Sequence, residues 1–438
     1  MIEYRNLKVA LLGAGNVGAQ VAALLLEHSA ELAERVGAGL ELIGIAVRDL
    51  DAERTADLPR ELLTTDTESL ILNADIVIEL LGGLEPAREY ILQALNSGAD
   101  VITGNKALLA THGPELFEAA EQVGAQLYYE AAVAGAIPII RPLHDSLAGD
   151  RVRRILGIVN GTTNFILDRM HTKGATLQEA LATATELGFA EADPTADIGG
   201  YDAAQKAAIL ASLAFHTVVP LDAVYREGIT GITLEQVEAA RHAGYVIKLL
   251  AICERLVDAQ GTEGVSARVY PALVPQDHPL AAVHGGKNAV FIEADAAGDL
   301  MFYGAGAGGL ETASAVLGDL VSAARRHVIG GPGIAESRHA ILPILPMASI
   351  TTRYQITLAV PDQPGVLAAI AELFREHGVS VETLVQSVRV RRDESTPSAT
   401  LVIGTHEASE ASLAATVSSL ATSPVVETVS SVLRVEGL

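Results

Sequence analysis

The sequence predicts an α/β protein with a doubly wound parallel sheet, a central α+β domain and a small C-terminal domain of βαββαβ order. Three observations support this fold class. Short apolar runs alternate with amphipathic helical stretches from about 7 to 134, and the pattern becomes mixed between about 138 and 310. Strand-like alternation then resumes at Tyr354, after a stretch rich in Gly and Pro.

The N-terminal part contains five short apolar runs that are candidates for strands. Helical stretches separate them, and a repeated strand-helix order is typical of a parallel sheet. The candidate strands are 7–12, 40–47, 76–81, 100–103 and 126–130.

The central part is expected to form an α+β domain that serves substrate binding and dimerisation. Strands are predicted at 154–159 and 300–303, and Thr176 and Glu179 form a capping box for a helix that Gly188 closes. The apolar run 245–253 is predicted to be a buried helix. It contains the only cysteine, Cys253, so an internal disulfide is excluded and an oxidising compartment is not indicated.

The C-terminal part follows a predicted linker at 328–352, which contains Gly330-Gly331-Pro332-Gly333. Turn signals then separate six elements, in the order of a ferredoxin-like domain. They are a strand at 354–360, a helix at 366–377, strands at 379–390 and 399–405, a helix at 409–421 and a strand at 425–435.

The composition excludes several classes of protein. A chain of 438 residues with 49% hydrophobic and 19% charged residues can bury several cores, which excludes a disordered or fibrous protein. The net charge of -24 would repel phosphate backbones and anionic lipids, so neither nucleic acid nor membrane is expected as a partner. The N-terminus does not resemble a signal peptide, and no apolar run reaches the ~18 residues of a membrane span. A cytoplasmic protein is therefore expected.

A glycine-rich turn follows the first predicted strand and opens a helix. Gly13-Ala14-Gly15-Asn16-Val17-Gly18 has the spacing G-x-G-x-x-G, which in this position directs backbone N–H groups at a pyrophosphate. Gly13 would form the tight turn, Gly15 would admit the phosphate and Gly18 would allow close packing of helix on strand. The motif predicts a Rossmann-like dinucleotide site, and the alternative is a tight turn without a cofactor.

The choice of dinucleotide depends on residues after the second predicted strand. Arg48 suits the 2′-phosphate of NADP, whereas Asp49 suits the ribose diol of NAD. Because Arg48 comes first, NADP(H) is expected to be preferred, with NAD(H) as the alternative. Arg48 could equally be a solvated charge at a strand end. Lys106 ends Thr103-Gly104-Asn105-Lys106 on the cofactor side, where it can face nicotinamide and substrate.

The most specific stretch is 188–206, in which four acidic residues and a lysine lie close together. Pro194 and the following glycines predict a loop, and 202–215 predicts an apolar helix with Asp202 and Lys206 on one face. One interpretation of the pair is a surface salt bridge, worth under ~1 kcal/mol. The surrounding alanines and leucines favour a buried cleft, in which a lysine can be tuned for proton transfer.

Five segments together resemble the homoserine dehydrogenases over the whole chain. They are 188–206, Asn160-Gly161-Thr162-Thr163-Asn164, Thr103-Gly104-Asn105-Lys106, Glu130-Ala131-Ala132-Val133-Ala134-Gly135 and Gly304-Ala305-Gly306-Ala307-Gly308. The resemblance implies NAD(P)-dependent interconversion of L-homoserine and L-aspartate 4-semialdehyde, a step toward threonine, methionine and isoleucine. Hydride transfer to or from nicotinamide requires that the substrate oxygen gain or lose one proton.

The resemblance also implies roles for individual residues. Lys206 would transfer the proton, with Asp202 and Lys106 beside it. The substrate would be bound by Glu191, Asp197, Asp202 and Thr162. The cofactor would be held by Gly13, Gly15, Asn16, Val17, Gly18, Arg48, Lys106, Gly188 and Gly306. A monovalent cation, typically Na⁺, would be coordinated by groups matching Glu130, Val133, Gly135 and Ile137. The expected domains are 1–137 for the dinucleotide, completed by about 304–327, and 138–303 for the substrate.

The C-terminal segment 353–438 resembles the ACT domain, a regulatory module. By this resemblance the residues that could hold a small amino acid, usually between paired domains, are Asp362, Gly365, Val366, Val379 and Val381. Threonine is the expected feedback inhibitor, and a homodimer or homotetramer is expected. The alternative is a dimerisation module that has lost its ligand.

The residues disfavour three other functions. A thioester route, as in aspartate-semialdehyde dehydrogenase, needs a reactive cysteine, and Cys253 has no histidine near it in the sequence. Metal-dependent alcohol oxidation fits poorly, because the twelve histidines are scattered and no His/Cys spacing resembles a zinc site. A non-catalytic amino-acid sensor would be expected to lack one of the site residues, such as Lys206 or Lys106. Because the chain begins at the first strand of the dinucleotide domain, a monofunctional enzyme without a fused kinase is expected.

Overall fold

The computed structural model describes residues 6–258, 260–331, 336, 338–389 and 398–437. It contains two compact units. The first comprises Met1–Gly161, Asp202–Val224 and Gly286–Ile341, and the second comprises Thr162–Tyr201, Tyr225–Gly285 and Leu342–Leu438. Part of the predicted linker, 332–335 and 337, lies outside the described residues.

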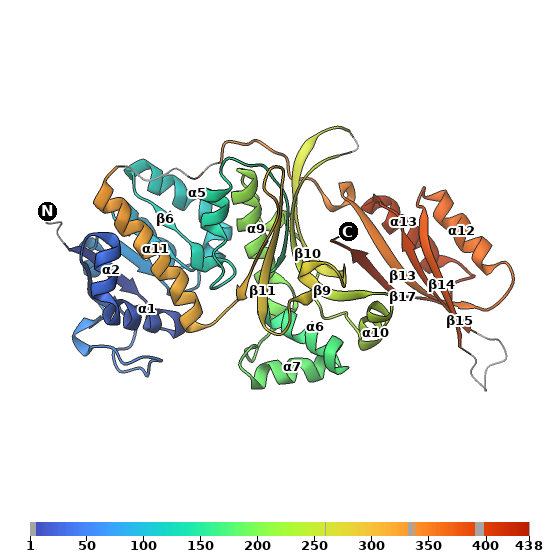
Figure 1. Cartoon of the computed structure of the whole chain (residues 1–438), viewed down its shortest axis with the longest axis horizontal. Helices are drawn as coiled ribbons and strands as arrows, with labels where there is room; N and C mark the ends of the chain where they lie inside the picture. The colour runs from blue at the N-terminus through green and yellow to red at the C-terminus, as the bar shows by residue number, and fades with distance from the viewer. Residues whose placement is uncertain (1–5, 259, 332–335, 337, 390–397, 438) are drawn as a thin grey trace. The chain divides into compact units, whose positions relative to one another are not determined.

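The first unit contains a parallel sheet, as predicted from the strand-helix alternation (Figure 1). Its order in the described residues is β3-β2-β1-β4-β5-β6, so the strand order reverses between β1 and β4, where doubly wound sheets bind their ligands. The strands are β1 (Leu7–Leu12), β2 (Leu40–Ala46), β3 (Leu63–Thr64), β4 (Ile76–Glu79), β5 (Asp100–Thr103) and β6 (Leu127–Tyr128).

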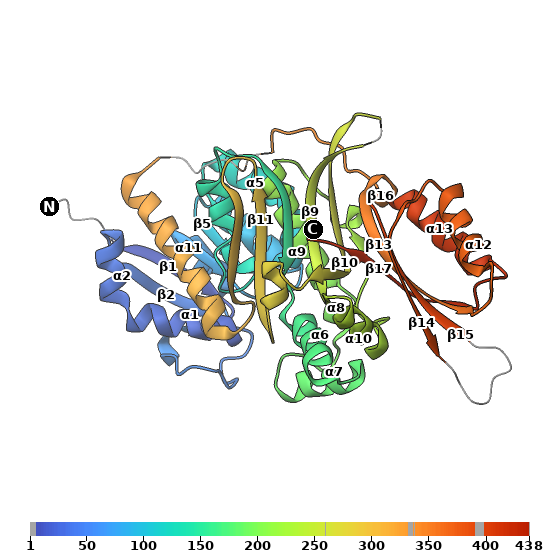
Figure 2. The same ribbon diagram turned by 45° about the vertical axis from the view of Figure 1, so that its right-hand side comes forward.

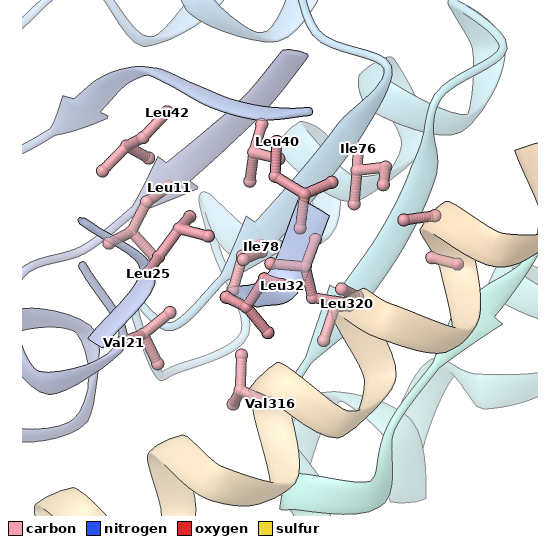
Figure 3. Packing of buried hydrophobic residues seen from close by; sticks show 14 of the residues in the cluster. Leu11, Val21, Leu25, Leu32, Leu40, Leu42, Ile76, Ile78, Val316 and Leu320 are labelled. Atoms are coloured by element: carbon pink, nitrogen blue, oxygen red, sulfur yellow. The ribbon is translucent and has the colours of Figure 1, made fainter. Parts of the chain in front are cut away.

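Helices cover this sheet and create its core. α1 (Asn16–Glu27), α2 (Ser29–Val36) and α11 (Gly309–Ile329) bury their apolar side chains against β1, β2 and β4. Figure 3 shows Val316 and Leu320 of α11 directed toward Ile78 of β4. Each such side chain contributes about 1.5–3 kcal/mol when it is fully buried. The sheet is thus completed by a helix from a distant part of the sequence. The remaining helices here are α3 (Thr67–Leu72), α4 (Ala87–Asn96) and α5 (Lys106–Val123).

The first unit also contains an antiparallel group of strands and the helix with the candidate lysine. β11 (Lys287–Ala294) pairs with both β12 (Gly298–Ala305) and β7 (Val152–Ile158). The helix α9 (Tyr201–Phe215) is buried along most of its length because alanine, leucine and isoleucine occupy nearly all its faces. Its predicted start at 202 differs from the observed start by one residue.

The second unit contains a long antiparallel ribbon of β9 (Tyr245–Val257) and β10 (Glu263–Pro275). The prediction of a buried helix at 245–253 is therefore wrong. Both faces of this strand are buried, so its apolar residues run without the alternation that marks a half-exposed strand. Cys253 lies on β9, and burial raises the pKa of its thiol to about 12, although Arg268 partly offsets this effect.

Short helices and one short strand accompany the ribbon. They are α6 (Gly161–Lys173), α7 (Leu177–Glu186), α8 (Thr195–Ile198), α10 (Leu234–His242) and β8 (Tyr225–Arg226). The predicted capping box of α7 is confirmed, because the Thr176 side chain accepts from the backbone of Glu179 and the Glu179 side chain accepts from the backbone of Thr176. Gly188, with φ of 77°, follows this helix in the left-handed conformation.

The C-terminal part of the second unit has the predicted βαββαβ order. β13 (Thr351–Pro361), α12 (Val366–Glu376), β14 (Val381–Arg389), β15 (Ser398–Thr405), α13 (Glu410–Thr422) and β17 (Thr428–Val435) follow one another, with a short β16 (Ala408–Ser409) before α13. Figure 2 shows α12 and α13 on the same side of the sheet, whose order is β17-β13-β15-β14. β17 also pairs in parallel with β10. Among the described helices, none is both long and apolar enough to cross a bilayer.

Candidate active site

A lysine and an aspartate form a buried ion pair on α9. Nζ of Lys206 lies 2.7 Å from Oδ2 of Asp202, one helical turn earlier, and the two side chains are 11% and 10% exposed. The same amine donates to the backbone oxygen of Val159 at 2.7 Å. The pair is therefore enclosed by protein, unlike an ordinary surface salt bridge.

The Asp202 carboxylate is held in its charged form by three donors. Besides Lys206, Nδ2 of Asn160 donates to Oδ2 at 2.9 Å, and Nζ of Lys106 lies 3.3 Å from Oδ1. Burial alone would raise the pKa of Asp202, but the charges of Lys206 and Lys106 outweigh burial and lower the pKa to about 2. Lys106 is 40% exposed. The Asp202 carboxylate thus contacts both the buried amine of Lys206 and the more exposed amine of Lys106.

The glycine loop between β1 and α1 has the space that a pyrophosphate needs. Gly13 has a φ of 99°, and a Cβ on Gly18 would lie 2.0 Å from the Gly13 oxygen. Apart from Gly15 and its two neighbours in the chain, no described residue has an atom within 4 Å of a Cβ position on Gly15. Helix α1 begins at Asn16, and no described side chain caps its first turn. The loop residues Asn16, Val17 and Gly18 thus offer backbone N–H groups to an anion, which fits a dinucleotide.

A buried network fixes the position of Lys106 at the start of α5. Oγ1 of Thr103 donates to Glu79 at 2.6 Å, and the backbone N–H of Asn105 donates to Oγ1 of Thr103 at 3.0 Å. The Asn105 side chain then caps α5 by accepting from the N–H of Leu108. Burial raises the pKa of Glu79, although its hydrogen bonds oppose the shift. Glu79 was not predicted as a site residue. The pattern that could have indicated it is an acidic residue at the end of an apolar strand.

The loop that contains Gly306 packs against a buried asparagine. A Cβ on Gly306 would lie 2.1 Å from Cγ of Asn288, and a Cβ on Gly135 would lie 2.4 Å from the Gly306 oxygen. Neither polar atom of the Asn288 side chain has a hydrogen-bond partner in the described part of the chain. No pattern in the sequence indicates Asn288 as a site residue. Arg48 lies just beyond β2 and is exposed.

The Glu130 carboxylate is surrounded by N–H donors. They are the backbone groups of Ile139, Ile140 and Arg141 at 2.5, 2.7 and 3.0 Å, and Nε of Arg141 at 2.9 Å. A cation here would therefore have to bind backbone carbonyl oxygens. The following turn, with Val133 and Ile137 buried, has φ of 60° at both Ala134 and Gly135. No group of three or more His, Cys, Asp and Glu in the described residues could hold a metal.

Four predicted site residues belong to the second unit: Thr162, Gly188, Glu191 and Asp197. Oγ1 of Thr162 donates to the backbone oxygen of Phe189 at 2.6 Å, beside Gly188. Glu191 is exposed and Asp197 lies partly buried in α8. The chain passes from this unit into the first at Asp202, so the acidic segment leads directly into the helix with the buried pair.

A pocket of about 330 Å³ lies between β13 and α12 in the C-terminal part. Three of the predicted regulatory residues line it, namely Asp362, Gly365 and Val366. Val379 is buried and Val381 is exposed at the start of β14. Nε2 of Gln386 donates to Asp362 across this pocket at 3.2 Å.

Lys248 on β9 is a second buried amine, which the sequence analysis missed. It is 2% exposed and donates to Oδ1 of Asn164 at 3.0 Å and to the Val283 oxygen at 2.6 Å. Burial lowers its pKa to about 8, partly offset by the charge of Asp168. The signal was a lysine within the apolar run 245–253, which the incorrect helix prediction concealed.

Comparison with known families divides the chain into three successive matches. The NAD-binding domain of homoserine dehydrogenase matches residues 13–130, homoserine dehydrogenase matches 138–321 and the ACT domain matches 354–422. Together they include the glycine loop, the acidic segment with α9, and the pocket between β13 and α12.

Individual proteins match over nearly the whole chain. A homoserine dehydrogenase of Corynebacterium glutamicum is 53% identical over 98% of this chain and 95% of its own length. One of Mycobacterium tuberculosis is 55% identical over 99% of each chain.

Solved structures agree with these sequence matches. A homoserine dehydrogenase from Thiobacillus denitrificans is 38% identical, covers 99% of both chains and has a TM-score of 0.90. A hyperthermophilic archaeal homoserine dehydrogenase in complex with NADPH is 27% identical, covers 75% of this chain and 99% of that one, and has a TM-score of 0.61. From its matches in sequence and in fold, the chain belongs to the homoserine dehydrogenase family, oxidoreductases that act on a CH-OH group.

Proposed function

We propose that this chain interconverts L-homoserine and L-aspartate 4-semialdehyde, with Lys206 as the proton donor and acceptor. The observation that carries the proposal is the buried Lys206–Asp202 pair, in the same unit as the glycine loop. A buried amine with a fixed acidic partner is suited to proton transfer, and water does not compete with it. The reaction is a step toward threonine, methionine and isoleucine.

The roles of the residues follow from their contacts. A bound nicotinamide supplies or accepts the hydride. In oxidation, neutral Lys206 takes the hydroxyl proton of homoserine, and in reduction its ammonium returns the proton to the aldehyde oxygen. Asp202 orients this amine through the 2.7 Å contact. Lys106 reaches the same carboxylate from its exposed side and is available to the substrate.

Substrate binding is assigned to the acidic segment. Homoserine is a zwitterion, and its ammonium requires acidic partners, for which Glu191 and Asp197 are proposed, together with Asp202. Thr162 positions the neighbouring backbone through its bond to Phe189. We also propose the domain division 1–137 with about 304–327, 138–303, 328–352 and 353–438.

The preferred cofactor is proposed to be NADP(H). Arg48 is exposed after β2, where an arginine suits a 2′-phosphate. The archaeal relative in complex with NADPH supports this choice. The glycine loop, with Gly188 and Gly306, would hold the dinucleotide.

A structural Na⁺ is proposed at the turn that contains Glu130, Val133, Gly135 and Ile137. Because N–H donors occupy the Glu130 carboxylate, the backbone carbonyl oxygens of this turn would be the ligands. Hard oxygen ligands suit such a cation.

Feedback inhibition by threonine is proposed for the ACT domain. Asp362 beside Gly365 in the pocket offers an acid and backbone groups to a small amino acid. A homo-oligomer is supported by β14, an edge strand of the described sheet that exposes Leu384 and Val385.

The test follows the absorbance of the reduced cofactor. Purified protein is supplied with homoserine and either NADP or NAD, with and without threonine, and the Lys206→Ala variant is measured in parallel. We expect turnover by the parent, preference for NADP, inhibition by threonine, and loss of turnover with retained nucleotide binding in Lys206→Ala. Absence of homoserine turnover in the parent would contradict the proposal and favour a non-catalytic amino-acid sensor.

A further inference from the structure

The loop before α9 is pressed against the segment 225–229 of the same unit. The N–H of Ile229 donates to the Ile198 oxygen, at the end of α8, at 2.8 Å. A Cβ on Gly228 would lie 2.2 Å from that same oxygen. The two backbones therefore touch at a point where only glycine fits, so the position of α8 depends on the segment 225–229.

One side chain of that segment, Arg226, contacts both ends of the turn between α8 and α9. Its guanidinium donates to the backbone oxygen of Gly199 and lies 3.5 Å from the ring centroid of Tyr201. Between them, Gly200 has a φ of 78°, and a Cβ there would meet Cγ of Arg226 at 3.3 Å. A planar guanidinium can donate a hydrogen bond to a carbonyl and stack its face on an aromatic ring at the same time. Lysine cannot make both contacts.

The segment with Arg226 is in turn fixed to the ribbon and to the C-terminal domain. Arg226 pairs with Val269 of β10, and the N–H of Glu227 donates to the Val269 oxygen at 2.8 Å. The carboxylate of Glu227 lies 3.0 Å from Nη1 of Arg434, which belongs to β17. Figure 2 shows β17 beside β10, and β17 lies between β10 and β13 in the sheet.

Arg434 is the centre of an aromatic and acidic cluster to which the C-terminal domain, β8 and β10 all contribute. Its Nε donates to Glu410 at 3.1 Å, and the hydroxyl of Tyr354 donates to the same carboxylate at 2.7 Å. Its guanidinium also lies over the rings of Tyr270, Tyr225 and Tyr354, at 4.6, 5.5 and 5.6 Å. Tyr354 is on β13, the strand that continues to the pocket at Asp362.

We infer that Arg226 is a positioning residue for substrate, which sets the turn that joins the acidic segment to the catalytic helix. We further infer that Glu227 connects this turn to Arg434, so that the ACT domain acts on substrate binding through the segment 225–227. This inference rests on the proposed function, because it assigns Asp197 of α8 to the substrate. It assigns no role to Arg226 in nucleotide binding.

The first test replaces the guanidinium. Arg226→Met loses a charge-assisted hydrogen bond and the ring contact, which together correspond to roughly a 10- to 100-fold change. We expect the KM for homoserine to rise by that factor, the KM for NADP to stay within about twofold, and kcat to fall less than the KM rises. Arg226→Lys keeps the charge without the planar fork, so it should recover part of the loss.

Arg338→Met is the matched control for this substitution. Arg338 also lies over an aromatic ring, that of Phe117 at 5.9 Å, and also donates to a backbone oxygen, that of Pro114 at 3.1 Å, but in the first unit. It should leave the KM for homoserine unchanged. If Arg226→Met does not fold, Arg226→Lys provides the test, because its KM for homoserine should rise while its KM for NADP stays unchanged. Equal changes in both KM values, or none, would overturn the role of Arg226.

The second test cuts the connection to the C-terminal domain. Glu227→Gln removes one charge of the Glu227–Arg434 pair and should raise the KM for homoserine about two- to fivefold, the range of a partly exposed ion pair. Glu382→Gln removes the equivalent charge of the 3.0 Å pair with Arg353 and should have no effect; Glu382 is 40% exposed and Glu227 is 48% exposed. Equal KM values in the two variants would overturn the connection. A parent without homoserine turnover would overturn the proposed function itself, and the inference with it.

Discussion

Replacing Lys206 with arginine should separate the charge of this residue from its capacity to transfer a proton. Arginine retains a positive charge beside Asp202 but is not deprotonated in proteins. We therefore expect Lys206→Arg to fold and to bind nucleotide, yet to lose turnover. The buried 2.7 Å contact with Asp202 is the reason that charge must be preserved in this variant.

The magnitude follows from the enclosed position of the amine. General acid–base catalysis by a positioned side chain contributes about 10²–10⁴-fold, which corresponds to roughly 2.7–5.4 kcal/mol in the activation free energy. Lys206→Met should lose as much turnover as Lys206→Arg. It should also have a lower free energy of unfolding, because breaking a buried ion pair costs about 3–5 kcal/mol. Lys106 at 3.3 Å remains beside Asp202 and reduces that cost. Adding Asp202→Asn should recover part of the stability.

The assay combines three measurements on each variant. Initial rates of homoserine oxidation give kcat, isothermal titration calorimetry gives nucleotide affinity, and urea unfolding gives the free energy of unfolding. If Lys206→Arg retains kcat within tenfold of the parent while Lys206→Met does not, charge is what matters, and proton transfer by Lys206 is refuted.

Three further predictions follow from the same structure. Homoserine oxidation releases a proton and semialdehyde reduction takes one up, so oxidation should accelerate toward alkaline pH whereas reduction should not; initial rates in both directions test this. Gly15→Ala should fold normally but bind nucleotide more weakly, since a Cβ meets only open space, whereas Gly18→Ala should be destabilised because its Cβ would lie 2.0 Å from the Gly13 oxygen; thermal unfolding and nucleotide titration separate the two. Lys248 has a folded-state pKa of about 8 against an ordinary 10.5, so its protonation opposes folding below pH 8 and this penalty disappears as pH rises from 8 to 10.5. The free energy of unfolding of the parent, relative to Lys248→Met, should rise by about 3 kcal/mol over that window in urea unfolding.

Each of these predictions has a control in the chain. Identical pH profiles in the two directions would contradict proton transfer by a single amine. Gly149→Ala, at another open position, should alter neither stability nor nucleotide affinity. A constant difference between the parent and Lys248→Met from pH 8 to 10.5 would contradict the burial argument.

Features encoded in neighbouring residues could be predicted from the sequence. The capping box at Thr176 and Glu179 depends on residues three positions apart, and the glycine loop follows directly from its strand. The placement of Asp202 and Lys206 on one helical face depends only on the helical repeat. In each case the physical cause lies within one or two helical turns.

Features that depend on tertiary packing could not be predicted. The strand β9 was mistaken for a helix because burial of both its faces erases the alternation that marks a strand. Val159, a partner of Lys206, and Asn160, a partner of Asp202, each lie more than 40 residues from that partner in the sequence. The contact of Arg226 with Gly199 likewise exists only after the chain has folded. The sequence therefore indicates which side chains could take part in catalysis, and the fold determines which of them contact one another.

The burial of Cys253 on β9 has a practical consequence for spectroscopy. At neutral pH its thiol is both shielded and protonated, so maleimides and other thiolate-selective reagents should leave the folded protein unmodified. Since the chain has one cysteine in total, a cysteine introduced on a surface loop would be the single point of attachment for a fluorophore or spin label. Movement of the loop before α9 could then be followed without first removing a native residue.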